Sequence, residues 1–170
     1  MDIKRVGAKE IAALALQAAA SPRRRINLNL HEARDDTVQR LLNDFEPGTY
    51  LRPHRHWDKW ELLVHLQGAA AVLTFDPACR VEERIELGAD RVRVVEIPPG
   101  TWHTLVALAP GTVLFEVKRG PYEPEAPAEF AFWAPCEGDS AAEAFERLLR
   151  TAGPGTRVAL AGGTPADLQS

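Results

Sequence analysis

The sequence predicts an all-β fold, a barrel or a sandwich, with one helix before it and another after it. Between residues 48 and 118, short segments of alternating apolar and polar residues are separated by Gly- and Pro-containing turns about ten residues apart. The chain has 170 residues, of which 45% are hydrophobic, and this is enough for one domain with a sizeable core.

The N-terminal segment predicts a helix at about residues 8–20. Its apolar run, "IAALALQAAASPRRR", resembles the core of a signal peptide. Glu10 and Gln17 interrupt the run, however, and the basic residues follow it instead of preceding it. We therefore expect an Ala-rich amphipathic helix that ends at Ser21-Pro22.

The next two segments predict strands. In "RINLNLHE", Ile26, Leu28 and Leu30 alternate with polar residues, which is typical of a half-buried strand. The segment "DDTVQRLLNDFEPGTY" has an apolar spacing that also suits a helix, but it runs into the Pro47-Gly48 turn, and within an all-β fold we interpret it as a strand.

The middle of the chain predicts a hairpin followed by further strands. "AAAVLTFD" and "VEERIEL" flank the turn at residues 76–78 and form the hairpin. "RVRVVEI" and "HTLVALA" each end at a turn that contains Pro and Gly, and "TVLFEVK" is a further strand.

The C-terminal part combines an irregular segment with a helix. The Pro-rich stretch "GPYEPEAPAEFAFWAP" is expected to wrap around the surface of the barrel. Ser140 and Glu143 have the spacing of a capping box ahead of a helix at about residues 141–151. We therefore divide the chain into an N-terminal helical segment, a β-barrel, and a C-terminal helix with a tail, at residues 1–23, 24–138 and 139–170.

Composition argues against several classes of partner. The net charge is −4, so no basic surface indicates nucleic-acid binding, and no apolar stretch reaches the ~18 residues that a membrane span needs. Cys79 and Cys136 form no CxxC pair, so a disulfide framework is not expected, although a single bridge stays open. We expect a cytoplasmic protein.

Two histidines lie one residue apart in "LRPHRHWDKWE", residues 51–61. Residues i and i+2 of a strand share a face about 6.6 Å apart, so the imidazoles of His54 and His56 can converge on one ion. Glu61 begins the returning strand, and His103 follows the "PPGTW" turn on a later strand. Three imidazoles and one carboxylate suit a transition metal such as Fe, Mn, Ni, Co or Zn better than Ca or Mg.

This spacing resembles the two motifs of the cupin superfamily. The chain matches the first motif at every fixed position, namely Gly48, His54, His56, Glu61 and Gly68. The second motif is represented by "PPG", two residues and His103, with Val92 and Ala107 where the motif has Gly and Asn.

Further stretches, among them "PGTYLRPHRH", "EIPPGTWH" and "FAFWAP", make residues 24–138 resemble the WbuC-type cupins. The resemblance implies a double-stranded β-helix, or jelly-roll barrel, with a divalent transition metal (Fe, Mn, Ni or Zn) at its open end. It also implies an association with polysaccharide biosynthesis, but no established reaction.

Cupins often form homodimers that exchange N-terminal strands, and we expect a homodimer here. The polar stripe of the first strand, Asn27, Asn29 and His31, then has two interpretations. It is either an exposed strand face or the lining of the neighbouring subunit's pocket.

Arg52 lies two residues before His54 and shares its face. Its guanidinium could clamp a carboxylate or phosphate of a ligand. Alternatively, it is an interior charge paired with Glu61 or Glu116.

Other polar residues are candidates for the pocket or its support. Glu116 and Lys118 share one face of the last core strand, and Tyr122 follows, so they form either a pocket rim or an exposed ion-paired face. His65 has the parity of Glu61 but lies about 13 Å along the strand, so we expect a buried, hydrogen-bonded histidine there.

Three functions stay open. The first is a metal-dependent isomerase, epimerase or lyase that acts on a small oxygenated ligand such as a sugar derivative, with Glu61, Arg52 and Tyr122 in catalysis. The second is an Fe-dependent dioxygenase, and the third is a binding module without turnover. Without a metal, the carboxylate and the histidines would form an acid/base set, as in metal-independent sugar epimerases of the same fold.

Overall fold

The computed structural model describes residues 3–122 and 129–159. Helix α1 spans Ala8–Ala20 and helix α2 spans Ala142–Thr151. In the described part of the chain ten strands lie between them: β1 Arg25–Asn29, β2 Val38–Phe45, β3 His54–Arg55, β4 Glu61–Gln67, β5 Ala70–Phe75, β6 Val81–Leu87, β7 Val94–Ile97, β8 Trp102–Ala107, β9 Thr112–Arg119 and β10 Glu129–Phe130.

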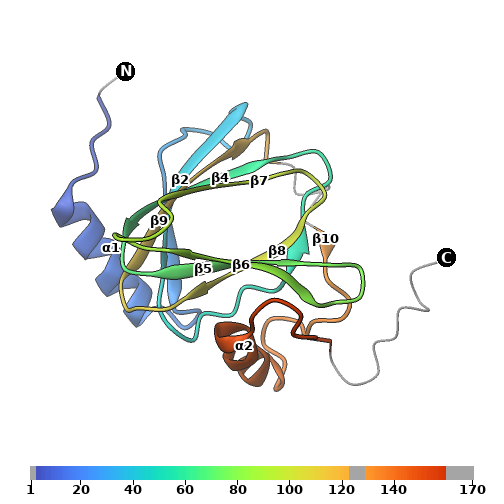
Figure 1. Cartoon of the computed structure of the whole chain (residues 1–170). Coiled ribbons are helices and arrows are strands. Elements are labelled where there is room, and N and C mark those ends of the chain that lie inside the picture. The colour runs from blue at the N-terminus through green and yellow to red at the C-terminus, as the bar shows by residue number, and fades with distance from the viewer. Residues whose placement is uncertain (1–2, 123–128, 160–170) are drawn as a thin grey trace.

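The strands form two antiparallel five-stranded sheets that face each other (Figure 1). Their strand orders are β1-β2-β9-β4-β7 and β10-β3-β8-β5-β6. From β3 to β9 the chain crosses repeatedly between the two sheets, so consecutive strands build both walls of one barrel. This is the double-stranded β-helix that the resemblance to cupins implies, and the predicted fold class is confirmed.

Each sheet has an inner face and an outer face because side chains alternate along a strand. Leu63 of β4 and Val72 of β5 pack together between the sheets. Leu14 of α1 packs against Leu42 on the outer face of the first sheet. Phe145 of α2 packs on the outer face of the second sheet, and Figure 1 shows the two helices on these different sides of the barrel.

The predicted elements are confirmed, with one correction at α2. The helix at residues 8–20, the strand at residues 38–45 and the hairpin of β5 and β6 are all present. The capping box was wrong, because the N-cap is Ala141 and makes no side-chain hydrogen bond. Ser140 lies one residue too early, and the carboxylate of Glu143 pairs with Arg147 one turn later.

Several other expectations concern the rest of the chain. Cys79 and Cys136 are both free, so the single bridge that the sequence left open is not formed. Among the described residues, no helix is long and apolar enough to cross a membrane. The tail from residue 160 and part of the Pro-rich segment, residues 123–128, lie outside the described residues.

Gly68 shows why this motif position requires glycine. Its φ is +76°, and a Cβ there would lie 2.7 Å from Cα of Thr112. Thr112 cannot retreat, because its hydroxyl is hydrogen-bonded to the backbone of Ala69 and Ala109. The Gly68 carbonyl also lies 2.8 Å from Nε2 of His65, which confirms His65 as a buried, hydrogen-bonded histidine.

We expect Gly68→Ala to lower the free energy of unfolding by about 2–4 kcal/mol, because a left-handed backbone penalty adds to a steric clash. Gly153→Ala is the matched control, since a Cβ at that position meets no atom within 4 Å. Urea titrations monitored by circular dichroism measure both variants. Equal unfolding midpoints for the two would contradict this explanation of the motif.

Candidate metal centre

Three strands bring the four predicted ligands to one end of the barrel. His54 lies on β3, and its Cα is paired with that of His103 on β8. Glu61 is the first residue of β4 in the opposite sheet, and His56 lies in the segment between β3 and β4. The cluster therefore connects the two walls of the barrel.

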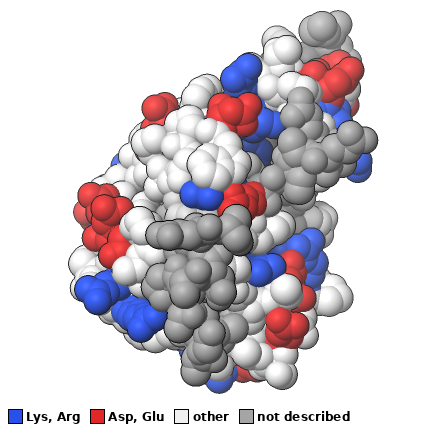
Figure 2. Space-filling view, turned by 90° about the vertical axis from the view of Figure 1, so that its right-hand side faces the viewer, with Lys and Arg blue, Asp and Glu red and all other residues white. Residues whose placement is uncertain are grey.

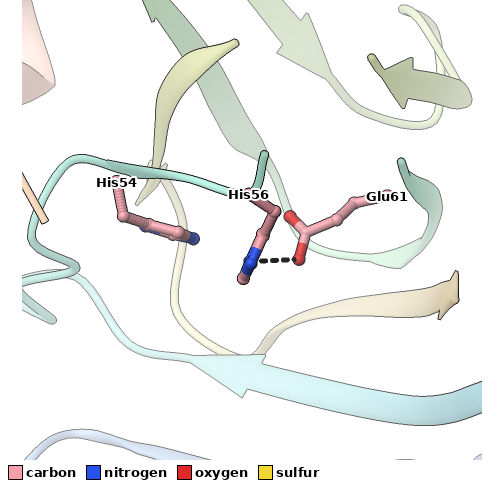
Figure 3. A group of neighbouring side chains, drawn as sticks. All are labelled: His54, His56 and Glu61. Atoms are coloured by element: carbon pink, nitrogen blue, oxygen red, sulfur yellow. Dashed lines mark ion pairs between the residues drawn. The ribbon is translucent and has the colours of Figure 1, made fainter. Parts of the chain in front are cut away.

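The carboxylate of Glu61 contacts two of the imidazoles, and Figure 3 shows its ion pair with His56. Its Oε1 lies 3.1 Å from Nε2 of His56, and its Oε2 lies 3.0 Å from Nε2 of His103. The ligand atoms of His54, His56 and Glu61 all lie within 4.8 Å of one another, and the ring centroids of His54 and His103 are 4.5 Å apart. His54, His56 and Glu61 thus form a group that could hold a divalent metal, with His103 beside it.

Hydrogen bonds to the backbone orient two of the imidazoles. Nδ1 of His54 lies 3.0 Å from the carbonyl of Arg52, and Nδ1 of His103 lies 2.8 Å from the carbonyl of Thr101. A carbonyl only accepts, so each Nδ1 carries the proton and each Nε2 is left for the cluster. Nε2 of His103 lies 3.0 Å from a carboxylate oxygen of Glu61, so either a proton on Nε2 or a metal ion must lie between the two atoms. The donor set therefore fits a metal ion.

Burial and neighbouring charges keep two of the ligands unprotonated, as metal binding requires. Burial, with a contribution from His103, lowers the pKa of His54 to about 3, so the ring is neutral at pH 7. Burial alone would raise the pKa of Glu61. Hydrogen bonds from His103 and His56 and the charge of Lys118 outweigh burial, and the pKa lies well below its ordinary value.

Lys118 and Glu116 form an ion pair on the wall of the barrel. Nζ of Lys118 lies 2.6 Å from Oε1 of Glu116 and 3.2 Å from Oε1 of Glu61, and Asn43 donates to Oε2 of Glu116 at 2.6 Å. Burial alone would lower the pKa of Lys118. The negative charges of Glu116 and Glu61 outweigh burial, so the pKa of Lys118 lies above its ordinary value. Glu116 is only 8% exposed, so the alternative of an exposed ion-paired face is wrong.

Two cavities reach the cluster. An inner one of about 200 Å³ is lined by His54, Glu61 and Lys118, with Asn27 and Asn43 on its wall. Asn27 thus faces the chain's own cavity, where it is also exposed to solvent and donates to Asn29. Asn43 could not be identified from the sequence, because the face on which a residue lies cannot be assigned in a segment whose apolar spacing suits either a helix or a strand.

An outer cavity of about 560 Å³ shares His54 and Lys118 with the inner one and is also lined by Arg52 and Tyr122. The Tyr122 side chain is largely exposed, and the guanidinium of Arg34 lies 5.7 Å from the centroid of its ring. Arg52 and Tyr122 thus line the outer cavity, whereas Glu61 lines the inner one.

Arg52 lines the outer cavity but pairs with neither Glu61 nor Glu116. Its guanidinium donates to the carbonyl of Ala131 at 2.8 Å and to Sγ of Cys136 at 3.2 Å. The alternative of an interior ion pair is wrong, because the chain that follows β10 holds this side chain. No sequence pattern indicates such a contact between segments about 80 residues apart.

Arg55 anchors the short strand that carries His54. Its guanidinium lies between the rings of Trp57 and Trp102, at 3.6 and 4.4 Å from their centroids. The same guanidinium pairs with Glu129 of β10 at 2.9 Å. These contacts hold β3 from its outer side, while His54 projects toward the cluster.

Comparisons with known families and curated proteins assign no function. A family model described as a domain of unknown function (DUF6016) matches residues 6–87, which end with β6 and include His54, His56 and Glu61 but not His103. No curated protein matches the sequence.

Solved structures show a likeness in fold alone. The TT1209 protein from Thermus thermophilus is 19% identical, with a TM-score of 0.50 over 70% of this chain and 97% of that protein. KdgF from Halomonas sp. is 20% identical, with a TM-score of 0.47 over 58% and 82% of the two chains. A cupin superfamily protein from Desulfitobacterium hafniense is 21% identical, with a TM-score of 0.45 over 56% and 76%.

The depressed pKa of His54 predicts a pH dependence of stability in the metal-free protein. Between pH 6.5 and about 3 the unfolded chain binds a proton at this histidine that the folded chain does not, so stability falls as the pH falls through this window. We expect wild type to lose about 1–3 kcal/mol more than His54→Gln between pH 7 and pH 4.5. Urea titrations of chelator-treated protein test this.

The matched control for that experiment is His31→Gln, which removes a histidine remote from the cluster, one that is hydrogen-bonded to the backbone of Arg40. This variant should keep the wild-type slope. Parallel pH profiles for wild type and His54→Gln would show that His54 is not buried in its neutral form.

Proposed function

We propose that this protein binds one divalent transition metal through His54, His56, Glu61 and His103 and uses the site on a small oxygenated ligand. The observation that carries the proposal is the convergence of three imidazoles on one buried carboxylate at the open end of the barrel. Nitrogen-rich donor sets of this kind select Fe, Mn, Ni or Zn over Ca and Mg.

The two cavities supply the place for the ligand. A bound metal would act as a Lewis acid on an oxygen of that ligand. The inner cavity is lined by two carboxylates, and if Glu61 binds the metal, Glu116 is the one that does not. Lys118 and Asn43 fix the orientation of Glu116. Glu116 is therefore better placed than the exposed Tyr122 to accept a proton from the ligand. This placement supports our proposal of an isomerase or epimerase reaction on a sugar derivative.

A binding role without turnover is the second candidate. Lys118 contacts both Glu61 and Glu116, so neither of these carboxylates is a free base. If this ion pair persists with the ligand present, the cavity recognises the ligand but moves no proton.

The resemblance in residues 24–138 supports a more specific proposal, a WbuC-type protein associated with polysaccharide biosynthesis. A homodimer and a cytoplasmic location belong to the same proposal. Size-exclusion chromatography with light scattering tests the dimer directly.

Metal content tests the primary proposal. We expect one equivalent of metal per chain, and we expect Glu61→Gln and His103→Ala each to weaken binding by more than the roughly 10–100-fold that loss of an outer-shell partner costs. His31→Ala is the control. Competition with a chromogenic chelator measures the affinities, and wild-type affinity in His103→Ala would contradict the assignment.

Proton exchange separates the two candidate functions. If the protein is an isomerase or epimerase, metal-loaded protein in D2O should introduce deuterium at a carbon next to an oxygenated carbon of its ligand, and Glu116→Gln should slow this exchange by about 100-fold or more while metal content is unchanged. Glu143→Gln, on the exposed face of α2, is the matched control. Ligands that raise the melting temperature but never exchange would instead support the binding role.

A further inference from the structure

The carboxylate of Glu137 lies between two arginines at the mouth of the outer cavity. Nε and Nη2 of Arg23 donate to its two oxygens at 2.6 and 2.7 Å, and Nη2 of Arg25 donates at 2.9 Å. The hydrogen bond from Arg23 outweighs burial and lowers the pKa of Glu137, so the group is an anion. Two guanidiniums thus form a ready-made carboxylate site.

Arg25 is the arginine of this site that the surrounding structure holds in place. It lies on β1 opposite Phe45, with its side chain only 15% exposed, and its Nη1 donates to the carbonyl of Tyr50 at 2.9 Å. Its orientation is therefore fixed whether or not Glu137 is bound. Arg23, at 61% exposure, is a flexible partner by comparison.

Positive charge exceeds negative charge around the outer cavity. Its described lining includes four cationic side chains, Arg23, Arg25, Arg52 and Lys118, but a single carboxylate, Glu137. Lys118 forms ion pairs with Glu61 and Glu116 in the inner cavity, whereas Arg52 makes no ion pair with any described residue. On the face of the molecule that Figure 2 shows, basic and acidic side chains are interspersed.

We propose that the ligand of the metal centre is a small hydroxy- or oxo-carboxylic acid whose carboxylate displaces Glu137 from Arg25. The inference rests on the proposed function and narrows its ligand class. Glu137 occupies the carboxylate position from the protein's own chain, and its side chain is 42% exposed and can leave toward solvent. The ion pair of Glu137 with Arg25 is open to solvent on the Glu137 side, which limits its strength, so a ligand that also reaches the metal wins this competition.

Arg25, His54 and His56 line the same 560 Å³ cavity, so one ligand can contact both the arginine and the cluster. This volume suits a molecule of sugar-acid size. The hydroxyl or oxo oxygens would face the metal end and the carboxylate would face β1. Arg52 lies on the same lining and adds a second positive charge for the acid.

The test uses zinc-loaded protein and acids paired with uncharged counterparts: glycerate and gluconate against glycerol and glucitol, by isothermal titration calorimetry at low salt. We expect the acids to bind and the alcohols not to. Glu137→Gln should tighten acid binding by about tenfold, because it removes the competing anion. Arg25→Gln should weaken it by roughly 10–100-fold.

Glu86→Gln is the matched control, because Glu86 also lies between two arginines, Arg84 and Arg91, but on β6 outside the cavity. It should leave acid binding unchanged. Melting temperatures establish that each variant is folded, and Glu137→Gln carries the test if Arg25→Gln is not.

Two results would overturn the inference: acids that bind no better than alcohols, or acid binding that Glu137→Gln leaves at the wild-type value, as expected if the metal alone holds the acid. Metal content is measured separately. A protein that takes up none of Fe, Mn, Ni or Zn would refute the proposed function, and the effect of Glu137→Gln on acid binding to Arg25 would then be measured in the metal-free protein.

Discussion

A buried carboxylate, that of Glu61, is the constraint on which the site depends. At 6% exposure its charge would be costly without partners, and it has three: His56, His103 and Lys118. These partners come from both sheets, so the two walls of the barrel meet through one charge at this end. Toward the other end the same inner faces carry apolar residues, among them Leu63 and Leu114, which pack together. An apolar core thus fills one end of the barrel, and the polar cluster with its two cavities lies at the other end.

The charges around Glu61 are arranged in layers. Next to it, the single positive charge of Lys118 faces the two negative charges of Glu61 and Glu116, so a divalent metal would change the net charge of this group from negative to positive. Further out, Arg25 holds a carboxylate from the chain itself. A metal centre followed by a cationic mouth is complementary to an oxygenated acid, and this complementarity connects the proposed function with the proposed ligand class.

Local patterns were sufficient for the fold and for the meeting of the four candidate ligands. Alternation in the sequence predicted β5, β6 and β9, and motif spacing placed His103 near His54, where the two are directly paired across β3 and β8. What failed depends on contacts between distant segments. Arg52 is held by residues 131 and 136, and Glu137 by residues 23 and 25, and neither contact leaves a local signal. The capping box at α2 failed by one residue, which is within the usual uncertainty of helix ends.

The central claim is that one metal ion lies among His54, His56, Glu61 and His103. Anomalous diffraction from crystals grown with zinc, measured on both sides of the zinc absorption edge, tests it most directly. We predict one dominant peak at about 2.0–2.2 Å from Nε2 of the three histidines and from an oxygen of Glu61. A dominant peak elsewhere, or one from which His103 is turned away, would contradict the account.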